Sequence, residues 1–180
     1  MNTRKYSLFG ILGPLAAIFF IGLSITLSPW FSWHYNALSD LGHAVRSEVA
    51  QLFNFGLLMA GFFTTIYSIT ALKNHAKYTS FCLLTSALLL QLVATFDEVY
   101  GFLHFLASIF FFISLNFATL IYAVERKSKI ATMAFMISFG SWVLYLAGIY
   151  QSGIAVPEII SSLATSSWII LSAMHTLDKS

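Results

Sequence analysis

The feature that most constrains this chain is the recurrence of apolar stretches long enough to cross a membrane. An uncharged stretch extends from Tyr6 to Pro29, and a membrane-spanning helix needs roughly 20 residues at about 1.5 Å each. This first stretch is too long for a signal peptide, so we predict a retained helix. Together with five later stretches, the predicted helices cover residues 6–29, 49–72, 78–96, 99–124, 130–150 and 154–174.

Composition supports lipid as the solvent of this fold. The 180 residues are 58% hydrophobic and 9% charged, whereas soluble domains carry about 25% charged residues. Short connections predict that consecutive helices are antiparallel neighbours. We therefore predict an all-α membrane protein, a six-helix bundle forming a single domain over residues 1–180, with a short interfacial helix after the first span.

The distribution of basic residues predicts how the bundle is oriented in the cell membrane. Eight of the nine lie on the side of the termini, and Arg46 lies opposite. The eight are Arg4, Lys5, Lys73, Lys77, Arg126, Lys127, Lys129 and Lys179. Since cytoplasmic loops are enriched in Lys and Arg, both termini are predicted to be cytoplasmic.

The acidic residues sort to the other side. Five of the seven lie opposite the termini: Asp40, Glu48, Asp97, Glu98 and Glu158. This asymmetry arises either by chance or because a cation is held there. The scattered basic residues and the net charge of +2 argue against nucleic-acid binding. The single cysteine, Cys82, excludes a disulfide framework and a cysteine-based zinc site.

The connection after the first span carries the densest polar pattern. From Asn36 onward we expect an amphipathic interfacial helix, on which Asp40 and His43 would lie side by side. Its polar face would hold Asn36, Ser39, Asp40, His43 and Arg46 or Ser47, and its apolar face Leu38, Leu41 and Val45. Trp30, Trp33 and Tyr35 suit an interfacial aromatic belt. The alternative is an interfacial helix whose polar face is merely solvated.

Three polar residues on the same side fall within the predicted spans. His104 lies roughly 10 Å below the start of its helix, where an ionisable residue is costly and indicates a functional site. The alternative is a neutral histidine bonded to a neighbouring helix. Asn54 suits either a binding site or helix–helix adhesion. Glu158 suits either a binding site or ordinary helix-start chemistry after Pro157.

Together these residues support a hypothesis of catalysis. Asp40, His43, Asp97 and His104 could hold zinc or another divalent metal ion. Asp40, Glu98 and His104 are the candidate catalytic groups, and the candidate binding residues are Ser39, Asn54, Tyr35, Arg46 and Glu158. The same groups could instead form a metal-free acid–base pair or a proton relay. Neither a fixed-spacing metal motif, a nucleophile elbow nor a Walker loop is present.

These residues also carry a family resemblance. Residues 35–42 (Tyr-Asn-Ala-Leu-Ser-Asp-Leu-Gly), residues 53–57 (Phe-Asn-Phe-Gly-Leu) and His104 make the chain similar to domain of unknown function 998, a family of archaeal and bacterial membrane proteins. That resemblance implies a multi-helix membrane protein and supplies no reaction. Ser39, Asp40, His43 and His104 have a looser likeness to the zinc-binding alkaline ceramidase and adiponectin receptor group. That group has seven helices and a late histidine pair, where this chain has only His175.

Three functions follow as hypotheses. The first is a membrane hydrolase that acts on a lipid or lipid-linked substrate. The second is a non-enzymatic protein that binds or transports a lipid or an amphiphilic small molecule. The third is a structural or accessory protein. The spacing of Gly56, Ala60 and Gly61 suits close helix packing within one copy or between copies.

Overall fold

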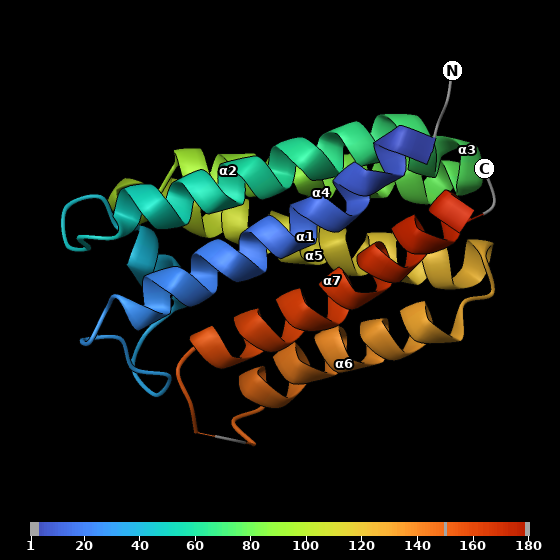
Figure 1. Cartoon of the computed structure of the whole chain (residues 1–180). Helices are drawn as coiled ribbons and strands as arrows, with labels where there is room; N and C mark the ends of the chain where they lie inside the picture. Colours follow the sequence, from blue (N-terminus) through green and yellow to red (C-terminus); the bar gives the residue numbers. More distant parts are fainter. Residues whose placement is uncertain (1–3, 150, 179–180) are drawn as a thin grey trace.

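The computed structural model describes residues 4–149 and 151–178, and within them the chain is helical with no strand. Six helices in this described part of the chain are long and apolar enough to cross a membrane. Their bounds are α1 Arg4–Thr26, α2 Ala50–Tyr67 continued by η2 Ser68–Leu72 and α3 Lys73–His75, α4 Lys77–Thr95, α5 Phe102–Glu125, α6 Lys129–Leu146 and α7 Ala155–Asp178. Helix α1 lies beside α2, α4 beside α5, and α6 beside α7 (Figure 1). The predicted six-helix membrane fold is confirmed.

Glycines at positive φ set two helix boundaries that differ from the prediction. Helix α5 begins at Phe102 rather than at residue 99, because Glu98–Tyr100 forms a separate 3₁₀ turn, η3. Gly101, with φ of 53°, separates the two elements. Helix α6 ends at Leu146, shortly before Gly148 with φ of 66°. The predicted end at Tyr150 falls outside the described residues.

The two ends of the bundle differ in charge. Helix α1 begins and α7 ends at the same end (Figure 1). We call this the basic end, because its described connections carry Lys73, Lys77, Arg126, Lys127 and Lys129. The opposite end holds the carboxyl groups of Asp40, Asp97, Glu98 and Glu158 and is called the acidic end. Lys179, counted in the prediction of orientation, lies outside the described residues.

Small residues bring the helices into close contact within one copy of the chain. A Cβ atom added at Gly56 would lie 2.6 Å from Cγ of Phe20, on α1. One added at Gly61 would lie 2.8 Å from the backbone oxygen of Ala87, on α4. The predicted small-residue spacing therefore packs α2 against both neighbours inside the monomer.

The interfacial helix is present but shorter than predicted. A 3₁₀ helix, η1, covers Leu38–Gly42, and the chain is extended at His43. Leu41 is fully buried, whereas Val45 is 79% exposed, so the expected apolar face does not continue to Val45. The turn ends where Gly42 meets α2, since an added Cβ there would lie 2.6 Å from Oδ1 of Asn54.

Candidate functional site

The segment Trp33–Gly42 is held across the acidic end by hydrogen bonds to three of its backbone carbonyls. Asn54 on α2 donates its side-chain N–H to the carbonyl of Gly42 at 2.8 Å. The N–H of Ala155, where α7 begins, donates to the carbonyl of Asn36 at 3.1 Å, and the N–H of Gly153 donates to the carbonyl of Trp33 at 3.0 Å. Asn54 thus bonds to the loop rather than to a neighbouring membrane helix. These bonds fix the position of η1.

Two carboxyl groups cap the start of η1. The first N–H groups of a helix have no partner within it. The N–H of Ala37 donates to Oδ2 of Asp40 at 2.9 Å. The N–H of Leu38 donates to Oε2 of Glu158 at 2.7 Å, which links residues 120 positions apart. Glu158, 8% exposed, therefore satisfies the backbone of η1 in addition to standing in the first turn of α7.

Ser39 and Glu98 complete this group of residues. The Ser39 hydroxyl donates to Oε1 of Glu98 at 2.5 Å. Burial raises the pKa of the Glu98 carboxyl above its ordinary value, and the carboxyl of Asp40 raises it further, against the hydrogen bond from Ser39. Asp40, Glu98 and Glu158, here called the carboxyl cluster, lie close enough to interact electrostatically.

The raised pKa of Glu98 predicts a loss of stability as pH increases. The unfolded chain releases this proton at lower pH than the folded chain, so the folded state binds more protons in between. Stability from this group is complete below the ordinary carboxyl pKa of 4.5 and declines as pH rises through the higher folded value. Melting temperatures should fall across this pH range, and Glu98→Gln should flatten the fall. If the melting temperature of Glu98→Gln falls as steeply with pH as that of the unmodified protein, Glu98 is not the group responsible.

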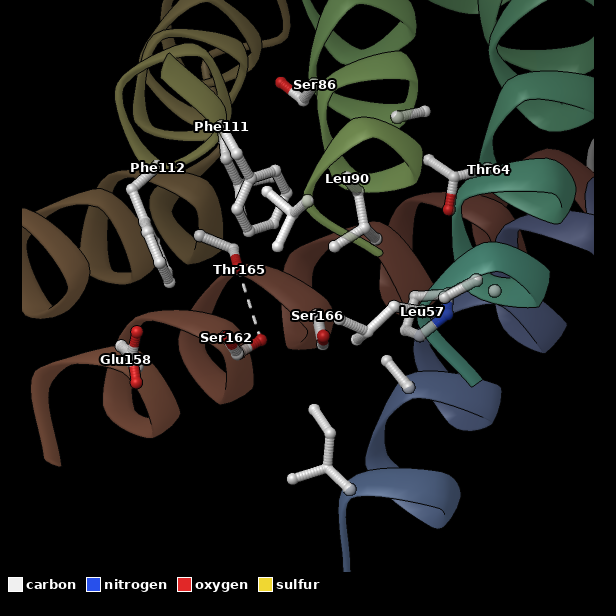
Figure 2. Close-up of a pocket in the computed structure, with 18 of the residues that line it drawn as sticks. Leu57, Thr64, Ser86, Leu90, Phe111, Phe112, Glu158, Ser162, Thr165 and Ser166 are labelled. Carbon is white, nitrogen blue, oxygen red and sulfur yellow. Dashed lines mark hydrogen bonds between the residues drawn. The ribbon is translucent and has the colours of Figure 1, made fainter. Parts of the chain in front are cut away.

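A cavity of about 110 Å³ runs from the carboxyl cluster toward the middle of the bundle. It opens to the outside of the bundle rather than being sealed. Ser39 and Glu158 line its acidic end, and the remaining walls are mostly apolar. Figure 2 shows Phe111 and Phe112 of α5 and Leu90 of α4 projecting into the space across from α7.

A row of hydroxyl groups on α7 leads inward from Glu158. Ser162, Thr165 and Ser166 line the cavity (Figure 2). Thr165 donates its hydroxyl to the carbonyl of Ser161 at 2.7 Å, so part of this row is bonded within its own helix. Sequence reasoning missed these residues, although the steps of three and four residues from Glu158 would have placed them on one face.

The side chains of His104 and Asp97 lie outside the carboxyl cluster and form hydrogen bonds with residues nearby in the sequence. The ring Nδ1 of His104 lies 2.7 Å from the carbonyl of Phe96, so it carries a proton, because a carbonyl accepts only. The ring Nε2 lies 3.3 Å from the Ser108 hydroxyl. Asp97 accepts the N–H of Val99 at 2.9 Å and caps η3. His104 nevertheless acts electrostatically on Glu98.

The remaining predicted residues do not converge with the carboxyl cluster. Tyr35 is 84% exposed and Arg46 is exposed at the surface. The ring Nδ1 of His43 accepts the nearby N–H of Val45 at 3.3 Å. Within residues 4–149 and 151–178, no three His, Cys, Asp or Glu side chains are grouped so that they could hold a metal ion. The predicted set Asp40, His43, Asp97 and His104 is thus not assembled as a metal centre.

Comparison with known proteins yields a family without a reaction. Residues 11–175 match the model of a family described as "Protein of unknown function (DUF998)". Neither a curated protein nor a solved structure matches the chain.

Proposed function

Because the chain belongs to the DUF998 family, whose description names no activity, we propose a function from geometry: the cavity binds an amphiphile. The apolar part of the ligand lies between α1, α2, α4, α5 and α7, which together line the cavity. Its polar head, a hydrogen-bond-donating cation such as an amine, lies against Glu158, Ser39 and Glu98. In this proposal the basic end faces the cytoplasm, so the ligand enters from the opposite leaflet.

The observation that carries this proposal is the chemistry of the cavity lining. Apart from Glu158 and seven serine or threonine residues the described lining is apolar, and it includes no Lys, Arg or His. Binding pockets commonly combine apolar walls with a few convergent polar groups. Carboxylates accept hydrogen bonds, so a cationic head would also relieve the repulsion within the carboxyl cluster.

The test uses ligands that share one tail and differ in the head. Octylamine, octanol and octanoate are titrated against the protein in lipid nanodiscs, and binding is measured by native mass spectrometry and by the shift in melting temperature. We expect octylamine to bind most tightly and octanoate least. Glu98→Gln should weaken octylamine by about tenfold, the usual scale for a lost charge-assisted hydrogen bond. Lys129→Gln, which changes a charge at the basic end, is the matched control.

The order of affinities decides the outcome. A carboxylate-based head site is contradicted if octanoate binds as tightly as octylamine. It is also contradicted if Lys129→Gln weakens octylamine binding as much as Glu98→Gln does. Preference for octylamine that survives in Lys129→Gln and falls in Glu98→Gln supports it.

One further observation favours a second candidate, a hydrolase acting on a lipid-linked substrate. The Ser39 hydroxyl donates a hydrogen bond to Glu98, and a serine nucleophile is activated by a base within hydrogen-bond reach. Ser39→Ala separates the two functions. It should abolish turnover of an ester of a long-chain alcohol if Ser39 is a nucleophile. In either case it should weaken octylamine binding only slightly, because the carboxylates of Glu158 and Glu98 still accept the ammonium group.

A further inference from the structure

A second cavity of about 340 Å³ lies at the basic end, away from the carboxyl cluster. The last turns of α3, α5 and α7 and the start of α6 form its walls. Its polar lining residues are His75, Tyr122, Arg126, Ser128, Ser172 and His175. Neither the amphiphile site nor the hydrolase hypothesis uses any of them.

Basic and imidazole groups from three helices converge on this cavity. The rings of His75 on α3 and His175 on α7 lie 5.6 Å apart between centroids. The ring Nε2 of His75 lies 3.4 Å from the hydroxyl of Tyr122, on α5. Arg126 follows the end of α5 and is exposed, and its charge acts on Tyr122. These groups supply hydrogen-bond donors and positive charge from several directions.

Glu125, which precedes Arg126 in the sequence, bonds to the start of α4 rather than to the cavity. Glu125 accepts the backbone N–H of Thr79 at 2.9 Å and its hydroxyl at 2.7 Å, so its carboxylate caps the start of α4. It does not line the cavity, and no Asp or Glu appears among the lining residues of the described chain. Among the described lining residues Arg126 therefore meets no carboxylate, although Glu125 acts electrostatically on Tyr122 from outside the lining.

An apolar floor lies beside the polar wall. Trp168 is buried, and its ring centroid lies 4.8 Å from that of Tyr122. Its indole N–H donates to the Thr119 hydroxyl at 2.8 Å, so the ring offers its apolar surface to the cavity. Ile130 and Leu171 extend this surface. A ligand with an anionic group joined to a less polar part would match both halves.

We propose that this cavity binds a phosphate group, with Arg126 and His175 as its principal donors. Guanidinium groups bind phosphate through two parallel hydrogen bonds. Hydroxyls of Ser128 and Ser172 lie within the same lining and add neutral donors. The exposed residues Lys73, Lys127 and Lys129 surround this end and draw anions toward it. The phosphate belongs either to a lipid headgroup or to a small soluble molecule.

The experiment tests a soluble phosphate and a lipid phosphate separately. The protein is held in nanodiscs of phosphatidylcholine, and glycerol 3-phosphate is titrated in one arm. In the other arm a short-chain phosphatidic acid is added, and bound molecules are counted by native mass spectrometry. Arg126→Gln and His175→Asn should each weaken binding by about tenfold. Lys129→Gln removes a nearby charge that does not line the cavity, and it should have a much smaller effect.

Each result has a defined meaning. Binding of either probe that depends on Arg126 or His175 supports the proposal, and the arm that responds identifies the source. The proposal is overturned if neither probe binds above the phosphatidylcholine background. It is also overturned if Lys129→Gln weakens binding as much as both cavity variants, since that would indicate a general basic surface. Unchanged melting temperatures in Arg126→Gln and His175→Asn show that weaker binding in these variants does not result from unfolding.

Discussion

Replacing Glu158 with alanine is expected to destabilise the protein and to remove ligand binding at the carboxyl cluster. The substitution leaves the buried N–H of Leu38 without its acceptor, and an unsatisfied buried donor costs about 1–3 kcal/mol. It also removes the hydrogen bond between η1 and the side chain on α7, although the N–H of Ala155 still donates to the carbonyl of Asn36. We expect a lower melting temperature in nanodiscs and an octylamine affinity reduced by at least about tenfold.

Glu158→Gln separates the two roles of this residue. The amide oxygen of glutamine can still accept the N–H of Leu38, so the melting temperature should stay near that of the unmodified protein. The negative charge is lost, so octylamine binding should remain weak. If the glutamine variant binds octylamine as well as the unmodified protein does, Glu158 does not contact the head. If it melts as early as the alanine variant, the hydrogen bond to Leu38 is not what stabilises η1.

Gly56→Ala is the second substitution for which we expect a large effect. The new methyl group would lie 2.6 Å from Cγ of Phe20, closer than a van der Waals contact permits. Helices α1 and α2 would have to separate, and overpacking of this kind costs about 1–3 kcal/mol. Thermal unfolding in nanodiscs should show a clear decrease in melting temperature.

Gly140→Ala provides the matched control for this prediction. Gly140 lies inside α6, and an added Cβ would meet no atom within 4 Å. Alanine is favoured over glycine in helices by about 1 kcal/mol, so this variant should be neutral or slightly stabilised. A similar decrease in both variants would mean that glycine is needed for a reason other than the contact between α1 and α2.

The helices were predictable because hydropathy is a local property. Each apolar stretch had to become a helix whatever its neighbours, since lipid leaves backbone groups no other partner. The early start predicted for α5 shows the limit of that reasoning. Val99 and Tyr100 carry no charge that would end an apolar stretch, and the positive φ of Gly101 is what separates η3 from α5.

The site was predictable in its location but not in its pairings. Ser39, Asp40, Glu98 and Glu158 were all singled out by their polarity on one side of the bundle. The bond from Leu38 to Glu158 was not, because it joins positions 120 residues apart and no periodicity encodes it. His104 was predicted to be functional because of its depth in the helix. Its ring is bonded to Phe96 and Ser108, so depth alone did not distinguish a local structural role from a chemical one.

The link between η1 and α7 has a consequence for how the protein is made. A membrane protein is synthesised from its N-terminus, so η1 emerges long before the helix that carries Glu158. Until α7 has entered the membrane, the N–H of Leu38 has no acceptor from that helix, and one wall of the cavity is missing. The proposed binding site is therefore completed only when the sixth described span, α7, is in place. A nascent chain with the first five spans lacks both the acceptor for the N–H of Leu38 and this wall of the cavity.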